Sequence, residues 1–84
     1  MPLYFFHLRN GADLMLDDEG RDLEGPAEVA AIALLEARSL MSQDVLNGEI
    51  SLNQRLDVED EQHNLVYSLS FDNAIAIVPS GIAK

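Results

Sequence analysis

The chain opens with a dense run of apolar and aromatic side chains at residues 2–9, Pro-Leu-Tyr-Phe-Phe-His-Leu-Arg. Aromatic and branched residues favour a β-strand, in which successive side chains point to opposite faces. Alternation divides the run into two sets, Tyr4, Phe6 and Leu8 on one face and Leu3, Phe5 and His7 on the other. Because both sets are largely apolar, we expect this strand to lie inside a sheet.

A short second strand is predicted directly after the first. Asn10-Gly11 is a turn signal, and residues 13–17 (Asp-Leu-Met-Leu-Asp) follow it, so the two strands would form a hairpin. Residues 17–20 (Asp-Asp-Glu-Gly) then form a turn, in which Gly20 can take a positive φ.

Residues 26–46 form the one long helical stretch. Gly25 is suited to the N-cap, Pro26 to the first helical position, and Asn47-Gly48 to the stop. The expected apolar stripe consists of Ala30, Ala33, Leu34, Ala37, Leu40, Met41 and Val45. A helix of this length is about 31 Å long, whereas a six-residue strand spans about 20 Å, so the helix should overhang the sheet or cross it diagonally.

Two further strands are expected after the helix. Residues 50–60 and 65–71 both alternate between apolar and polar positions, and a polar turn at 60–64 joins them as a second hairpin. Residues 72–78 are compatible with one helical turn or with a short fifth strand, since short apolar runs fit both.

These elements predict an α+β fold, with an antiparallel-rich sheet of about four strands in the order ββαββ and one long helix on one face. Residues 1–79 form a single domain, and residues 80–84 are expected to be a disordered tail. A chain of 84 residues without cysteine has a small core and no disulfide to stabilise it, which favours self-association.

The chain carries 15 acidic and five basic residues, a net charge of −10. Such a surface repels nucleic-acid backbones and anionic membranes, so neither is expected as a partner. The charge serves solubility, or it attracts a basic protein partner. No apolar run approaches the roughly 20 residues of a membrane span, and the start lacks the pattern of a signal peptide. We therefore expect a cytoplasmic protein.

Catalytic and cofactor motifs are missing from the sequence. It contains neither a G-x-S-x-G elbow, nor a phosphate-binding glycine loop, nor H-E-x-x-H. Two acidic clusters, at 17–19 and 59–61, fall in predicted turns and do not match a calcium loop. We expect no catalytic residue, no metal site and no cofactor.

His7 is the side chain with most chemical capacity, because its charge changes near neutral pH. It would lie beside Asp17 across the first hairpin, either as an acid–base pair or as a histidine held by a cross-strand carboxylate. Arg9 would be an ion-pair partner at the rim or an anion site. If the helix covers Tyr4, Phe6 and Leu8, then Leu3, Phe5, His7 and Met15 share the open face, and something must cover Phe5. Phe5, His7, Arg9 and Asp17 are the candidate binding residues.

Three apolar residues fall outside the stripe of the helix, namely Ile32, Leu35 and Leu46. They are either isolated exposed apolar side chains, which are normal, or the interface of a homodimer.

The opening Met-Pro-Leu-Tyr-Phe-Phe-His-Leu-Arg-Asn-Gly, followed by Leu-Asp-Asp-Glu-Gly and an alanine-rich helix, resembles a bacterial family of small uncharacterised proteins. Its members begin M-P-x-Y-F-F-H-x-R-x-G and have a D-x-x-G turn before the helix. The matching positions are Tyr4, Phe5, Phe6, His7, Arg9, Gly11, Asp17 and Gly20, and the likeness runs from residue 2 to about residue 72. The resemblance implies a domain of unknown function and supplies no catalytic residues.

Three functions follow as hypotheses. The leading one is a non-enzymatic protein-interaction module that forms a homodimer. A looser likeness to antitoxin-type domains, which place a hairpin before an Ala/Glu-rich helix, implies a protein that neutralises a basic partner. The third is a small enzyme or ligand-binding protein that uses His7 and Asp17.

Overall fold

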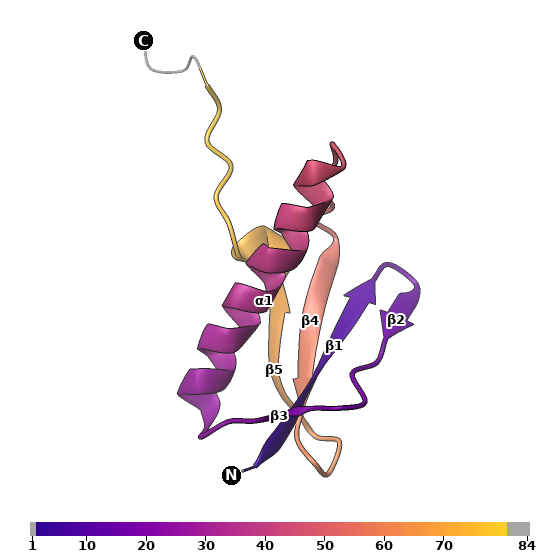
Figure 1. Ribbon diagram of the computed structural model, residues 1–84, viewed down its shortest axis with the longest axis vertical. Coiled ribbons are helices and arrows are strands. Elements are labelled where there is room, and N and C mark those ends of the chain that lie inside the picture. Colours follow the sequence, from indigo (N-terminus) through magenta and orange to yellow (C-terminus); the bar gives the residue numbers. More distant parts are fainter. Residues whose placement is uncertain (1, 81–84) are drawn as a thin grey trace.

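The first strand lies inside the sheet, as its two apolar faces predict. The computed structural model describes residues 2–80 and has an α+β architecture, with a five-stranded antiparallel sheet and one helix in that part of the chain (Figure 1). In chain order the elements are β1 (Leu3–Asn10), β2 (Asp13–Met15), β3 (Arg21–Asp22), α1 (Pro26–Leu46), β4 (Gln54–Glu59), β5 (Leu65–Ser70) and the 3-10 turn η1 (Phe71–Asn73). The strand order is β2-β1-β4-β5, and β3 pairs with the beginning of β1.

Two strand boundaries differ from the expected ones. The strand expected over 50–60 begins only at Gln54, since Asn10 and Gln54 are the last paired residues of β1 and β4. Among residues 2–80, no strand lies beside the chain before Gln54 to bond with it, and the side chain of Gln54 instead donates to the Ser51 carbonyl. The second strand ends at Met15, and β3 is an additional strand that the predicted ββαββ order lacked.

Helix α1 begins and ends where the sequence predicts. Gly25 is the N-cap and Pro26 the first helical residue, while Gly48 has a φ of 84° and its N–H donates to the Val45 carbonyl. The fully buried line consists of Val29, Ala33, Ala37 and Met41. Val45, which the expected stripe included, is exposed in the last turn.

The helix covers the face of the sheet that carries Tyr4, Phe6 and Leu8, which we call the helix face. It crosses the sheet diagonally and packs mainly over β4 and β5 (Figure 1). The buried core comprises Phe6, Leu23, Val29, Ala33, Ala37, Met41, Leu56, Val58, Leu69, Phe71 and Ala74. Ala33 and Ala37 are fully buried where α1 meets the sheet, and their small side chains let the helix lie close against it.

The segment after β5 resolves the ambiguity at 72–78. It forms one 3-10 turn, followed by an extended segment that belongs to no strand of the sheet. Phe71 and Ala74 are buried, and Arg38 Nε donates to the Ala74 carbonyl at 2.8 Å. Ile75 still packs against the core, and residues 76–80 then run away from the domain (Figure 1). Of the predicted disordered tail at 80–84, residues 81–84 lie outside the described residues.

Candidate functional site

The face of the sheet opposite the helix, which we call the open face, carries a polar network. Alternation along β1 and β4 places six side chains on this face. The strand register pairs them across the two strands, Phe5 with Glu59, His7 with Asp57 and Arg9 with Arg55. His7 and Asp57 are buried although no helix covers them. Their burial is therefore supplied by neighbouring side chains and by a loop.

Asp57 is the centre of this network. Its carboxylate accepts hydrogen bonds from Ser68 Oγ at 2.8 Å, Arg55 Nε at 2.9 Å and Arg9 Nε at 3.4 Å. Burial by itself raises the pKa of a carboxyl, but the Ser68 hydroxyl and the two guanidinium groups outweigh it, so the pKa of Asp57 lies below its ordinary value. Arg9 is thus an ion-pair partner, one of the two roles predicted for it.

His7 is fixed in one neutral tautomer by its two neighbours. Its Nδ1 accepts a hydrogen bond from the backbone N–H of Asp17 at 3.0 Å, so the proton of the neutral ring resides on Nε2. Nε2 then donates to Glu59 Oε1 at 3.2 Å. His7 and Asp17 do lie side by side, as predicted, but the backbone of Asp17 makes the contact.

The Asp17 carboxylate is committed to the backbone. Oδ2 accepts from the N–H of Phe6 at 3.0 Å, and Oδ1 accepts from those of Glu19 at 3.1 Å and Gly20 at 3.2 Å. Partial burial raises the pKa of this carboxyl, but the hydrogen bonds from the three N–H groups outweigh it, so the net pKa lies below its ordinary value. Asp17 therefore clamps the loop at 16–20 onto β1.

This loop covers Phe5. A Cβ atom on Gly20 would lie 2.9 Å from Phe5 Cε2 and 3.2 Å from Leu3 Cδ2, so the glycine backbone rests directly on the aromatic ring. The φ of 77° at Gly20 also requires glycine, as predicted. Met15 was expected on the same open face, and that prediction is wrong. Met15 pairs with Leu8, and cross-strand partners share a face, so it lies on the helix face.

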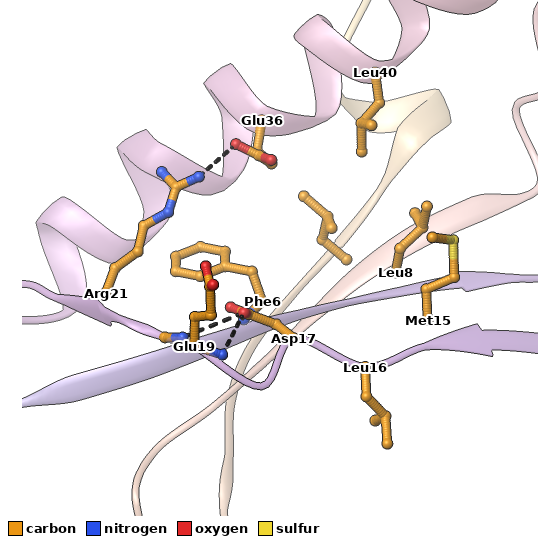
Figure 2. A pocket seen from close by; sticks show the side chains of 11 residues that line it. Phe6, Leu8, Met15, Leu16, Asp17, Glu19, Arg21, Glu36 and Leu40 are labelled. Atoms are coloured by element: carbon orange, nitrogen blue, oxygen red, sulfur yellow. Dashed lines mark hydrogen bonds and ion pairs between the residues drawn. The ribbon is translucent and has the colours of Figure 1, made fainter.

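A groove lies on the helix face between α1 and the β1–β2 edge (Figure 2). Its volume is about 310 Å³, and its apolar lining is formed by Phe6, Leu8, Met15, Leu16, Leu40 and Leu56. Arg21 and Glu36 form an ion pair of 2.8 Å at one end, where the Arg21 guanidinium lies 5.5 Å from the centre of the Phe6 ring. Asp17 and Glu19 contribute to the same rim. We call this feature the groove.

The sequence did not identify the groove or the role of Glu59. The polar alternation of Arg55, Asp57 and Glu59 was the available signal for the network, because it placed three charges opposite His7 and Arg9. No comparable signal existed for the groove, since its walls come together only through the diagonal placement of α1.

The predicted dimer residues occupy different environments. Ile32 is half-buried and packs against the core, whereas Leu35 and Leu46 are exposed on α1. Their role in a dimer stays a prediction. Among residues 2–80, no cluster of three or more histidine or acidic side chains is arranged to hold a metal ion. No helix in that range is long and apolar enough to cross a membrane.

Comparison with known proteins places the chain in a family. Neither the curated proteins nor the solved structures contain a match. One family model matches residues 3–72, which include all five strands, the helix and the Asp17 loop. The chain therefore belongs to the family described as Domain of unknown function (DUF6894).

Proposed function

We propose that the protein is a non-enzymatic interaction module that receives an apolar side chain of a protein partner in the groove. The observation that carries the proposal is the unfilled apolar lining beside a sheet edge. Met15 is 65% exposed there, although it faces Leu8 and the helix. Apolar surface of this kind, with a polar rim, is typical of an interaction site.

The size of the groove limits what it can bind. About 310 Å³ lies at the lower end of the range for ligand pockets, which suits one or two side chains rather than a large cofactor. No part of residues 2–80 fills the groove, because α1 packs mainly over β4 and β5 and the described segment after Ala74 leaves on the other side of the helix (Figure 1).

The charge around the groove defines the flanks of the partner. Asp17, Glu19 and Glu36 line the rim, and the one basic residue there, Arg21, is already paired with Glu36. The whole chain has a net charge of −10. A segment with an apolar anchor between lysines or arginines therefore complements both the lining and the rim. A basic partner is also what the looser likeness to antitoxin-type domains implies.

The proposal can be tested by NMR with methionine methyl labels. The probe is the peptide Lys-Lys-Leu-Lys-Lys with blocked ends, and the matched probe replaces its leucine by alanine. The Met15 methyl signal should move with the leucine peptide and respond weakly to the alanine peptide. Met41 is 3% exposed in the core and serves as the internal control.

Two neighbouring variants sharpen the test. Met15→Asp should abolish the leucine-dependent part of binding, because it places a charge over the apolar lining. Since this variant lacks the Met15 methyl, titration calorimetry measures binding in both variants. Leu14→Asp adds the same charge one residue away, but Leu14 pairs with Arg9 on the open face, so binding should persist. Equal binding of both peptides, or equal loss in both variants, would show that only charge attracts the probe.

The third hypothesis is a small enzyme or ligand-binding protein that uses His7 and Asp17. A cavity of about 290 Å³ beside both residues leaves room for a small ligand, but the two side chains lack the geometry of an acid–base pair. The Asp17 carboxylate accepts three backbone N–H groups and makes no hydrogen bond to the imidazole. In acid–base catalysis the imidazole and the carboxylate would exchange protons with a substrate. Here the hydrogen bonds of both side chains hold the loop at 16–20 against β1.

A further inference from the structure

The outer edge of β5 is an unprotected strand edge. β5 is the last strand in the order β2-β1-β4-β5, and within residues 2–80 no backbone hydrogen bond joins its outer side to another segment. Proteins usually protect such an edge with a charge, a proline or a very short strand. The sequence Leu-Val-Tyr-Ser-Leu-Ser of β5 has none of these, and Leu65 and Val66 are exposed.

The opposite edge of the sheet is protected by comparison. β2 has only three residues, it begins with Asp13, and the Asp17 loop follows it directly. A strand that adds to this sheet therefore finds a long uncharged edge only at β5.

The chain also carries an unpaired segment suited to such an edge. Residues 75–78 (Ile-Ala-Ile-Val) form no regular secondary structure, are uncharged and are rich in β-branched residues. Ile75 is half-buried against the core, whereas Ile77 and Val78 are 66% and 80% exposed. The next residue, Pro79, has no N–H to donate to a neighbouring strand. At about 3.3 Å per residue these four residues span about 13 Å, and the six residues of β5 span about 20 Å. The edge is thus long enough for the whole segment.

The anchor of the segment directs it away from the β5 of its own chain. The Ala74 carbonyl is bonded to Arg38, and the side chains of Phe71 and Ala74 are buried. The chain leaves this anchor beside the middle of α1 and runs outward (Figure 1). Folding back along its own β5 would require the chain to reverse its direction directly after the anchor (Figure 1).

We propose that two copies of the chain exchange these segments, so that Ile75–Val78 of each copy pairs with the outer edge of β5 of the other. A twofold dimer makes both contacts at once, because each copy supplies one segment and one edge. The contact joins two uncharged surfaces of chains that each carry −10. Added salt screens the repulsion between the copies and strengthens the dimer, in contrast to its effect on a basic peptide at the groove.

The test measures the dimer and its location together. Sedimentation equilibrium of the full chain should show a monomer–dimer equilibrium that tightens with salt. Hydrogen exchange should show that the amides of residues 75–78 and of β5 become protected together as the protein concentration rises.

A matched pair of variants identifies the segment. Ile77→Asp should weaken the dimer at least about tenfold, because the carboxylate would be buried at the new interface without a partner. Ser80→Asp adds the same charge beyond Pro79 and should leave the dimer within about twofold, since an exposed charge contributes little.

Several outcomes would overturn the proposal. One is a chain that stays monomeric at high micromolar concentration in high salt. Another is protection of the β5 amides that does not change with concentration, which would mean that the segment folds back within one chain. A third is a dimer that survives Ile77→Asp but dissociates with Leu35→Asp, because the interface would then be the outer face of α1. None of these results bears on peptide binding at the groove, which Met15 reports separately.

Discussion

The two faces of the sheet use alternate residues of the same strands, yet different forces bury them. On the helix face, Phe6, Leu56 and Val58 pack beneath α1 in an apolar core. On the open face, His7 and Asp57 are equally buried, but their neighbours are hydrogen-bonding groups and a loop held by Asp17. Both faces exclude water, so burial alone does not show where stability resides.

The difference concerns how each face responds to a lost contact. A cavity in the apolar core is filled only partly by relaxation of its neighbours, so the loss includes the transfer free energy of the deleted atoms and a term for the remaining cavity. In the polar network, the partners of a deleted group are half-exposed arginines and a serine that can turn to water. We therefore expect changes to the helix face to affect the free energy of unfolding more strongly.

The largest effect is expected for Phe71→Ala. Phe71 is fully buried, and replacement of a buried phenylalanine by alanine lowers the free energy of unfolding by about 3–5 kcal/mol. Urea denaturation followed by circular dichroism measures it. Leu35→Ala, on the exposed side of α1, should change the same quantity by less than about 0.5 kcal/mol. A small loss for Phe71→Ala would contradict the view that the helix face dominates stability.

The cover of the open face can be tested with two glycines that both have positive φ. Gly11→Ala should lower the free energy of unfolding by about 1–2 kcal/mol, because its φ of 62° disfavours a side chain while no atom lies within 4 Å of the new Cβ. Gly20→Ala should lower it further, since its Cβ also meets the Phe5 ring. If the two losses measured in urea are equal, the loop does not rest on Phe5 as described.

The polar network should respond less strongly. Asp57→Ala removes the acceptor of Ser68, Arg55 and Arg9, and we expect the free energy of unfolding to fall by about 1–2 kcal/mol. Asp57→Asn keeps the shape of the side chain and removes its charge. Its free energy of unfolding should lie between those of the wild type and Asp57→Ala. A loss as large as that of Phe71→Ala would show that the two faces contribute equally.

The pH dependence of stability gives the smallest and most specific effect. The pKa values of Asp17 and Asp57 are lowered in the folded chain, so the unfolded chain binds protons first as the pH falls. Their contribution is complete above the ordinary carboxyl pKa of about 4 and is lost progressively below it. Urea denaturation between pH 7 and 2 should show a shallower acid slope for Asp57→Asn than for wild type. An unchanged slope would mean that Asp57 is not stabilised as a carboxylate.

Local sequence patterns predicted most of the fold. The span of α1, the glycine turns and the interior position of β1 follow from capping residues and apolar periodicity, which act over a few neighbours. The residue at which β4 begins was not predictable in this way. Leu52 continues the apolar alternation and packs on the core, but a strand needs a partner, and β1 provides none beyond Gln54.

The candidate site was predictable only in part. Hairpin geometry predicts that His7 and Asp17 lie close together. Whether the backbone or the carboxylate of Asp17 contacts the imidazole depends on how the loop at 16–20 closes. Met15 was assigned to the wrong face because its register with Leu8 was unknown, and a shift of one residue reverses every side chain. The groove depends on the angle of α1, which no local pattern records.

The tautomer of His7 gives the closed loop a spectroscopic signature. A buried ring N–H that donates to Glu59 should exchange slowly with solvent and give its own proton resonance, and Nδ1 should keep the nitrogen shift of an unprotonated acceptor. If the loop at 16–20 opened, Nδ1 would lose the Asp17 N–H and both signals would change. The imidazole signals of His7 can therefore report, in real time, whether the loop at 16–20 is closed on β1.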